Sequence, residues 1–463
     1  MLSLEEIVAM LPGAHLVGKP LARITGVSTD SRSLAPGDLF VALRGERFDG
    51  HDYLGTVAAQ GATAALVEQP AEEDPGLPQI VVPDTRAGLG ALAARWRQRF
   101  ELPLVAVTGS NGKTTTKEMV AAILRAAYGA DDVLATTGNL NNDIGVPLTL
   151  LRLRSHHRAA VIELGMNHPG ETEALAEMAA PTVTLITNAQ REHQEFMQSV
   201  EAVAREHGLA ILALPASGTA VFPADDPHAT LWWNAAGDRR VIEFALRSGS
   251  SPLSPFMAAV SVTPGPAQAD GFGSQIRLHT PSGDVALDLA AAGQHNARNA
   301  AAAAAAASAL GWGVRAIKAG LESFRPVKGR MQKKRCLTGA LLIDDTYNAN
   351  PDSVLAAIEV LAGLPAPRTL VLGDMGEVGA AGPEFHAEIG RHAAARGIDA
   401  LLAIGPLCRE AVNADGARGT HFDDLAALVE AAQARATSGS LLVKGSRFMR
   451  MERVVQALAV PEA

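Results

Sequence analysis

The sequence has little of two features that would each indicate a particular class of protein, cysteine and an excess of basic charge. Its 463 residues include two cysteines, Cys336 and Cys408, which are too few for a disulfide framework or a cysteine-based metal cluster. Acidic residues outnumber basic ones by 49 to 40, and the net charge of −9 argues against a general nucleic-acid-binding protein. The scarcity of cysteine favours a reducing compartment, so we expect a cytoplasmic location.

Segments that would direct the chain into a membrane are missing as well. The first residues include Glu5 and Glu6 and no basic run, so no signal peptide is indicated. The alanine run over residues 300–307 is too short and too weakly apolar to span a bilayer, and a buried helix is expected there. A composition of 48% hydrophobic and 19% charged residues is typical of a globular protein. We expect a monomer without stable membrane insertion.

Three blocks of the chain alternate strand-like apolar runs with helical stretches. Strand-like runs lie at 38–43 and 64–67 in residues 1–98; at 104–107, 159–162 and 183–187 in residues 99–326; and at 340–343, 369–372, 400–404 and 440–443 in residues 327–463. The alternation predicts an α/β protein of three domains. We expect a central P-loop-type, mostly parallel sheet with helices on both faces, a C-terminal Rossmann-like domain and a smaller N-terminal α/β domain. Residues 246–285, richer in Ser, Pro and Gly, predict an irregular or antiparallel excursion.

A glycine-rich turn joins the strand-like run 104–107 to a helical segment at 117–128, and it predicts a phosphate-binding loop. The turn reads Thr108-Gly109-Ser110-Asn111-Gly112-Lys113-Thr114-Thr115. Glycines let backbone N–H groups point at a polyphosphate, and the helix N-terminus adds partial positive charge. Lys113 is placed to reach the β/γ-phosphates of ATP, and the Thr114 hydroxyl to bind Mg²⁺. Two residues separate Gly109 from Gly112, where the usual pattern has four before the Gly-Lys pair.

Two further side chains follow strands of the same predicted sheet, and both are candidate metal ligands. Glu163 ends the strand-like run 159–162, where a carboxylate beside the phosphate loop suits Mg²⁺. Taken alone, Glu163 would be interpreted as a solvated strand-end residue, and the phosphate loop beside it favours the role of a ligand. His193 follows the run 183–187, and a role at a second metal and a structural role are both open for it.

Polar residues elsewhere also stand where they could contact nucleotide or substrate. Asn296 and Asn299 share one face of the helix that opens the alanine run, and their amides could read an adenine edge or simply cap the helix. Arg330, at the second domain junction, could reach a phosphate. Asp345 could bind ribose hydroxyls or a metal, and Lys444 a phosphate or carboxylate; both end strands of the last block.

Together these residues resemble the Mur ligases, which build the peptide of bacterial peptidoglycan. The short loop at 108–114 looks like that family's own variant, Glu163 stands where the family places its Mg²⁺ carboxylate, and His193 where it places a metal-binding histidine. The segment 293–296 looks like the adenine-contact segment and Arg330 like the junction arginine. Matching motifs occur in all three blocks.

Several segments resemble the member of the family that adds D-Ala-D-Ala. The turn containing Ser31 and Arg32 resembles a uridine-nucleotide domain, and Asn139, Asn141 and Asn142 lie in a loop that resembles that member's substrate loop. The run 345–351, which contains Asn348 and Asn350, and the run 443–447 around Lys444 also fit. We take these residues as candidate substrate contacts.

The resemblance implies an ATP- and Mg²⁺-dependent ligase that joins D-Ala-D-Ala to UDP-MurNAc-tripeptide through an acyl phosphate. It implies substrate binding by residues 1–98, ATP binding by 99–326, and closure of 327–463 over the nucleotide. Other classes stay open at this point: an ATPase that only changes conformation, a kinase, a Mur ligase that adds a single amino acid, or a folate-type relative. The third residue of the tripeptide is likewise open.

One departure from the family concerns lysine. Mur ligases commonly hold a second Mg²⁺ with a carbamylated lysine a little after the position of His193, yet no lysine occurs between Lys117 and Lys318. The stretch that should contain it includes Glu206 and His207. We expect one of these two side chains to replace the lysine, unless the second metal is held differently or more weakly.

Overall fold

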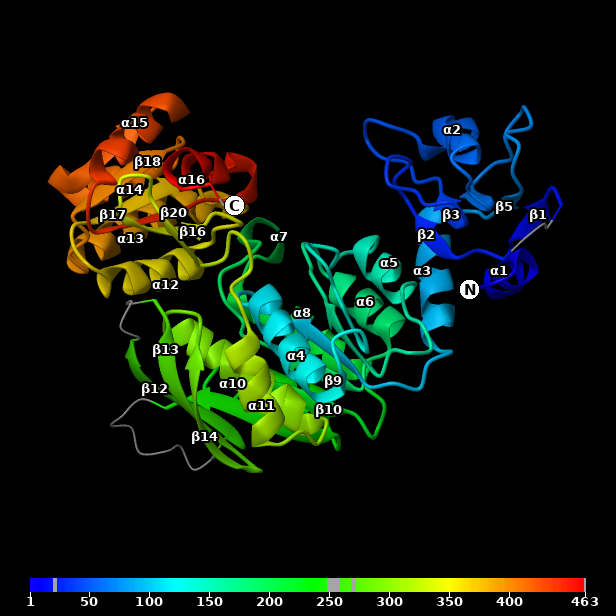
Figure 1. The fold of residues 1–463 in the computed structure, drawn as a ribbon, viewed down its shortest axis with the longest axis horizontal. Coiled ribbons are helices and arrows are strands. Elements are labelled where there is room, and N and C mark those ends of the chain that lie inside the picture. The colour runs from blue at the N-terminus through cyan, green and yellow to red at the C-terminus, as the bar shows by residue number, and fades with distance from the viewer. Residues whose placement is uncertain (20–22, 248–257, 268–271, 462–463) are drawn as a thin grey trace.

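The computed structural model describes residues 1–463 except 20–22, 248–257, 268–271 and 462–463. Its elements form three sheets that follow one another along the chain. The N-terminal unit (blue) and the C-terminal unit (yellow to red) flank the central unit along the longest axis of the molecule (Figure 1).

The N-terminal unit is a five-stranded sheet with the order β1-β5-β4-β3-β2, in which only β1 is antiparallel to its neighbour. Helix α3 leads from this unit into the central one, where it packs against α5 and α6. The elements are α1 (Leu4–Met10), β1 (His15–Val17), β2 (Gly26–Ser28), β3 (Asp38–Val41), α2 (Leu54–Ala59), β4 (Ala64–Val67), β5 (Gln79–Val81) and α3 (Thr85–Arg97).

The central unit is a nine-stranded sheet with the order β14-β13-β12-β11-β10-β9-β6-β8-β7. Strands β6 to β12 pair with one another in parallel, whereas β13 is antiparallel to both β12 and β14. The elements are β6 (Leu104–Thr108), α4 (Lys113–Tyr128), β7 (Val133–Ala135), α5 (Gly145–Leu150), β8 (Ala159–Glu163), α6 (Glu171–Ala179), β9 (Val183–Ile186), α7 (Gln194–Met197), α8 (Val200–Leu212), β10 (Thr219–Pro223), α9 (Ala229–Ala236), β11 (Arg240–Leu246), β12 (Val260–Ala267), β13 (Ser274–Thr280), β14 (Gly283–Leu289), α10 (Gln294–Ala309) and α11 (Val314–Ser323).

The C-terminal unit is a six-stranded sheet with the order β15-β16-β20-β17-β18-β19, parallel except for β15. The elements are β15 (Gln332–Arg335), β16 (Leu341–Asp345), α12 (Pro351–Ala362), β17 (Arg368–Gly373), α13 (Gly382–Ala395), β18 (Ala400–Ile404), α14 (Cys408–Asp415), β19 (Gly419–Phe422), α15 (Leu425–Arg435), β20 (Ser440–Lys444) and α16 (Glu452–Leu458).

Strand β6 shows how the central sheet carries helices on both faces. Its alternate residues point to opposite sides. Val105 and Val107 belong to one hydrophobic core with α4, α10 and α11, and Leu104 and Ala106 to another with α3 and α6. Strand β6 lies between β8 and β9. The next strands along the chain, β7 and β8, lie on one side of β6, and β9 and β10 lie on the other side. The loop after β6 therefore occupies a topological switch point, where ligands of such sheets bind. The predicted α/β class with a mostly parallel central sheet is confirmed.

The alanine run forms the middle of α10, and its eight side chains at 300–307 are buried, as predicted. Small side chains allow α10 to pack closely against both α4 and the sheet. The expected antiparallel excursion is confirmed in β12 to β14, although 248–257 and 268–271 of it lie outside the described residues. One prediction was wrong: α4 begins at Lys113, not at residue 117, because Gly112 starts the helix without a side-chain cap. No helix among the described residues is long and apolar enough to cross a membrane.

Candidate active site

A cleft of about 840 Å³ lies between the central and C-terminal units. It opens at the carboxyl ends of β6, β8 and β9 on one side and of β16 and β20 on the other. Most of the residues predicted from the sequence line it: Ser110, Asn111, Gly112, Lys113, Thr114, Thr115, Asn141, Asn142, Glu163, His193, Asn296, Asn299, Arg330, Asp345, Asn348, Asn350 and Lys444. Four do not: Gly109, which lies next in the chain to the lining residue Ser110, and Ser31, Arg32 and Asn139.

The two glycines of the phosphate loop explain why the short turn can exist. Gly109 has φ +124° and Gly112 has φ +84°, a region that favours glycine. A Cβ atom on Gly109 would lie 2.1 Å from Thr187 Oγ1, and one on Gly112 would lie 2.5 Å from Asn299 Oδ1. The loop is therefore pressed against β9 and α10 in a conformation that other residues would not tolerate.

Hydrogen bonds to the segment after β9 hold the loop in place. The backbone N–H of Ser110 donates to the Asn188 carbonyl (3.1 Å), and that of Asn111 donates to Asn188 Oδ1 (2.9 Å). Asn188 Nδ2 and Thr187 Oγ1 both donate to the Asn111 carbonyl, at 2.9 and 2.8 Å. These bonds fix the loop before any nucleotide enters, which lowers the ordering cost of binding.

Glu163 is buried at the end of β8, and only one of its two carboxylate oxygens accepts hydrogen bonds from the described residues. Thr114 Oγ1 (3.1 Å) and Asn141 Nδ2 (2.8 Å) donate to its Oε1. Its Oε2 is buried and has no hydrogen-bond partner among the described residues. A buried carboxylate oxygen without a donor is costly unless a cation meets it, so this donor set fits Mg²⁺, which prefers oxygen ligands.

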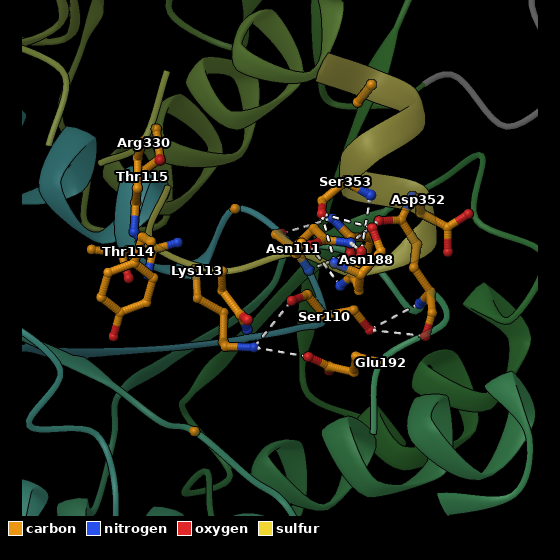
Figure 2. A pocket seen from close by; sticks show the side chains of 18 of the residues that line it. Ser110, Asn111, Lys113, Thr114, Thr115, Asn188, Glu192, Arg330, Asp352 and Ser353 are labelled. Carbon is orange, nitrogen blue, oxygen red and sulfur yellow. Dashed lines mark hydrogen bonds and ion pairs between the residues drawn. The ribbon is translucent and has the colours of Figure 1, made fainter. Parts of the chain in front are cut away.

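Lys113, at the start of α4, points along the floor of the cleft toward Glu192 (Figure 2). Its Nζ donates to the carbonyls of Gly109 (2.5 Å) and Ser110 (3.1 Å) and lies 3.2 Å from Glu192 Oε2. Burial opposes ionisation of Glu192, but the charge of Lys113 and the hydrogen bond from His207 outweigh it and lower the pKa of that carboxyl to about 2.

Behind Glu192, His207 is fully buried, and its burial lowers the pKa of the imidazole, so the ring is neutral at neutral pH. Its Nε2 lies 3.0 Å from Glu192 Oε1, and its Nδ1 lies 3.0 Å from Thr108 Oγ1. An ionised carboxylate can only accept, so Nε2 carries the proton and the Thr108 hydroxyl donates to Nδ1. The chain of bonds fixes one oxygen of Glu192 from behind.

His193 occupies a strained position between the two units. Its φ is +49°, and its Nδ1 lies 2.5 Å from Oε2 of Glu377, whose φ is +57°. The contact of Glu377 with His193 is the main reason that the pKa of Glu377 is lowered. With Nδ1 facing a carboxylate, Nε2 keeps its lone pair, and it lies 3.8 Å from Glu192 Oε2.

Neither residue expected to replace the family's lysine lines the cleft. Glu206 accepts hydrogen bonds from the backbone N–H groups of Gly170 (3.0 Å) and Thr172 (2.9 Å), so it caps the start of α6. His207 reaches the cleft only through Glu192. The geometry does not support a replacement by either side chain and directs attention to Glu192, which the sequence analysis did not single out.

Asn296 and Asn299 lie together in the first two turns of α10, both buried at the cleft. Asn299 Nδ2 donates to Asn296 Oδ1 (3.2 Å), and Asn296 Nδ2 donates to the Ala292 carbonyl (2.8 Å). The neighbouring His295 also lines the cleft, and burial lowers the pKa of its imidazole to about 4. The two amides thus support each other next to the phosphate loop.

The C-terminal unit brings Asp345 and Lys444 together because they are register partners at the ends of β16 and β20. Lys444 Nζ donates to Asp345 Oδ2 (2.6 Å) and to the Asn348 carbonyl (2.9 Å). Arg330 stacks on Tyr347, with its guanidinium carbon 4.1 Å from the ring centroid. Asn350 accepts from the Ser353 N–H (2.9 Å) and so caps α12.

The remaining predicted substrate residues lie on loops. Asn142 Oδ1 accepts from the Gly145 N–H (2.9 Å) at the start of α5, and Asn139 is exposed. In the N-terminal unit, Arg32 forms a two-pronged ion pair with Asp30, at 2.9 and 2.8 Å, and this bond lowers the pKa of Asp30 to about 2. Arg32 is largely exposed.

The sequence analysis assigned no role to several polar residues of the cleft, some of which lie in loops and others in the first turns of α6, α10 and α12. These are Asn167, Glu171, Gln190, Glu192, Asp225, Asp226, His295, Arg298, Asp352, Ser353, Glu377, Ser446 and Arg447. Proximity in the chain was the one available signal, since Gln190 and Glu192 fall between Asn188 and His193.

Comparison with known families covers all three units. The Mur ligase family catalytic domain matches residues 23–97, the Mur ligase middle domain matches 107–307, and the Mur ligase glutamate ligase domain matches 329–447. The chain belongs to the Mur ligase family.

Similar Mur ligases include curated proteins and solved structures. The UDP-N-acetylmuramoyl-tripeptide–D-alanyl-D-alanine ligase of Escherichia coli is 42% identical over 98% of both chains, and that of Haemophilus influenzae is 37% identical over 97% of both. A crystal structure of MurF from Acinetobacter baumannii superposes with a TM-score of 0.89 at 34% identity, over 98% of both chains. MurF ligase from Thermotoga maritima in complex with ADP gives 0.79 at 26% identity, over 93% of this chain and 96% of that one.

Proposed function

We propose that this Mur ligase joins D-Ala-D-Ala to UDP-MurNAc-tripeptide at the expense of ATP, giving UDP-MurNAc-pentapeptide, ADP and phosphate. The observation that carries the proposal is the cleft itself. It is lined by the phosphate loop, by Glu163 with its unpartnered Oε2, and by residues of the C-terminal unit. The name shared by relatives that match over nearly the whole chain supports the choice of substrates. Such a ligase serves peptidoglycan precursor synthesis, and through it cell shape and division.

The reaction we propose has two chemical steps. An oxygen of the tripeptide's terminal carboxylate attacks the γ-phosphorus of ATP, and ADP leaves. The amine of D-Ala-D-Ala then attacks the carbonyl carbon of the acyl phosphate, phosphate leaves, and an amide remains. Two anions must approach in the first step, so positive charge has to lie between them.

Five of this chain's residues are placed to provide or hold that charge. Lys113 exchanges its carbonyl partners for the β- and γ-phosphates. Arg330, stacked flat on Tyr347, offers its guanidinium edge to the same phosphates. Glu163 Oε2 and Thr114 Oγ1 would hold Mg²⁺, with His193 as a candidate ligand for a second ion; bound there, Mg²⁺ neutralises charge on the transferring phosphoryl group.

The three units divide the substrates in this proposal. Residues 1–98 bind the UDP-MurNAc-peptide through Ser31 and Arg32, and the loop with Asn139, Asn141 and Asn142 lies on the path to the cleft. Residues 99–326 bind ATP, with the Asn296–Asn299 pair toward the adenine and Asp345 toward the ribose. Residues 327–463 bind D-Ala-D-Ala near Asn348, Asn350 and Lys444, and close over the nucleotide about the Arg330 junction, because an acyl phosphate must be kept from water.

Phosphate release from ATP in the presence of UDP-MurNAc-tripeptide tests the proposal. Release should depend on D-Ala-D-Ala and should not be supported by single D-Ala or diaminopimelate, and a UDP-pentapeptide should form. Release without any acceptor dependence would place the protein among ATPases, and release supported by a single amino acid would place it among the ligases that add one residue.

A further inference from the structure

Glu192 lines the cleft, and its two carboxylate oxygens have different partners. On one side His207 Nε2 donates to Oε1, and His207 is itself held by Thr108. On the other side Oε2 faces Lys113 Nζ at 3.2 Å and His193 Nε2 at 3.8 Å. One oxygen is therefore fixed by the protein interior, and the other is turned to the two groups of the cleft.

The Lys113 partnership is temporary if Lys113 serves a nucleotide. The same Nζ that contacts Glu192 is needed at the phosphates in the proposed function, and it cannot hold both at full strength. When Lys113 moves, Glu192 Oε2 loses the ammonium group that lies 3.2 Å away and remains buried at 6% exposure. A carboxylate left in that state is costly, so another cation is favoured in its place.

His193 supplies the second half of a cation site. Its Nδ1 is turned to Glu377, an arrangement in which a carboxylate orients a metal-binding imidazole and leaves Nε2 as the ligand atom. The 3.8 Å between His193 Nε2 and Glu192 Oε2 exceeds a hydrogen bond. Two ligands of one ion, each at about 2.1 Å, stand about 3.0 to 4.2 Å apart. Both His193 and Glu377 have positive φ, and strain of that kind tends to persist at functional sites.

We propose that Glu192 is a cation-exchange carboxylate: it holds Lys113 in the nucleotide-free enzyme and, once Lys113 turns to the nucleotide, binds a divalent cation together with His193. His207 is a positioning residue that fixes the rotamer of Glu192. The ion is distinct from one held by Glu163 and Thr114, and it places a second positive charge on the opposite side of the phosphate loop. The inference rests on the proposed nucleotide role of Lys113, but its central test needs no nucleotide.

The test counts Mn²⁺ bound to the full chain by the loss of the free-ion signal in electron paramagnetic resonance. The wild type without nucleotide should bind no ion at Glu192, because Lys113 occupies it. Lys113→Met should bind one additional Mn²⁺ without nucleotide, and the double variant Lys113→Met/Glu192→Gln should lose it. If Lys113→Met binds no more than the wild type, or if the added ion survives Glu192→Gln, the inference is overturned.

A second arm uses a non-hydrolysable ATP analogue. The wild type should then bind two Mn²⁺, and both Glu192→Gln and His193→Asn should bind one, each with an unchanged melting temperature as evidence of folding. Glu171→Gln, which removes another cleft carboxylate whose oxygens face Asn167 and His168, should keep two. Two ions in Glu192→Gln would refute the site while leaving the proposed function intact. Failure of the wild type to bind the analogue would count against both.

Discussion

The side-chain amides of Asn111 and Asn350 hydrogen-bond to each other in both directions, Asn111 Nδ2 to Asn350 Oδ1 at 3.2 Å and Asn350 Nδ2 to Asn111 Oδ1 at 3.0 Å. One residue belongs to the phosphate loop, and the other caps the first helix of the C-terminal unit. The loop that meets ATP is thus tied directly to the unit expected to close over it, so occupancy of the loop and position of the C-terminal unit are coupled.

Asn350→Ser should loosen this coupling without unfolding α12. Serine keeps an oxygen for the helix cap, and Asn and Ser are about equally good caps, but it cannot form the amide pair. We expect a larger radius of gyration in small-angle scattering of the nucleotide-free enzyme, with little change in melting temperature. Asn142→Ser makes the same change inside the central unit, where Asn142 Oδ1 accepts from the Gly145 N–H at the start of α5, and it should leave the scattering unaltered. Equal scattering from the two variants would argue that the amide pair does not hold the units.

Arg191 forms an ionic link between the same two units. It contacts Asp352 and Glu388, each at 2.7 Å, and its guanidinium lies over the Phe385 ring at 5.1 Å. Because these groups are partly exposed, we expect Arg191→Gln to weaken docking by about 1–2 kcal/mol in total. Amide hydrogen exchange in α12 should become faster. Arg205→Gln, which removes an exposed pair with Glu201 within α8, is the matched control; if it has the same effect on α12, the ionic link is not the cause.

The sequence predicted best where chemistry depends on a strand end. Glu163, Asp345 and Lys444 each close a buried strand, and a parallel sheet brings such ends to one edge, so the pairing of Asp345 with Lys444 and the place of Glu163 beside the phosphate loop followed from the pattern. The phosphate loop was predictable for the same reason. The fold class rested on the alternation of strands and helices, which a parallel sheet requires.

Side-chain contacts between segments that are distant in the sequence could not be predicted in this way. Glu192 owes its place to His207, fifteen residues on in a different helix, and Glu377 owes its place to a turn of another unit. Asn142 and Asn350 are candidate substrate contacts by resemblance, and in the structure their side-chain oxygens accept hydrogen bonds at the starts of α5 and α12. Nothing in local sequence separates a capping amide from a binding one when both begin a helix.

His386 should make stability depend on pH. Its Nε2 accepts from the Met375 N–H (3.0 Å) and its Nδ1 lies 2.7 Å from the Gly382 carbonyl, so the buried ring fits only as the neutral form, and burial lowers its pKa. Below the unfolded value of about 6.5, the unfolded chain takes up a proton that the native ring resists, so the free energy of unfolding should fall as pH drops from there through the native pKa.

Denaturant unfolding of the wild type and His386→Gln between pH 5 and 8 isolates this contribution. The variant should be less stable near pH 8, and the difference between the two should shrink toward pH 5 as the wild type loses its advantage. His168→Gln, at a largely exposed histidine, should run parallel to the wild type. A pH-independent difference for His386→Gln would show that the ring acts by packing alone.

Glu163→Gln should separate stability from catalysis in a single substitution. Glutamine keeps an oxygen for the Thr114 and Asn141 donors and replaces the unpartnered Oε2 by an amide nitrogen. Removing a buried negative charge that lacks a partner should raise the nucleotide-free stability by about 1 kcal/mol, since the charge is costly there until a cation meets it. The same change should lower kcat by roughly 10²–10³, the cost of losing one electrostatic stabiliser of a developing charge.

Melting temperature without nucleotide and dipeptide-dependent phosphate release are the two readouts for Glu163→Gln. Thr114→Ser, which keeps the hydroxyl that donates to Glu163, serves as the control and should stay near the wild type in both. A lower melting temperature together with lower turnover would mean that Glu163 is a structural carboxylate. Near-normal turnover would remove it from the metal site whatever the stability does. A Glu163→Gln variant that is more stable and nearly inactive is the one result that fits a metal-binding role. In that role Glu163 Oε2 lacks a partner until Mg²⁺ binds, and this lowers the stability of the nucleotide-free protein.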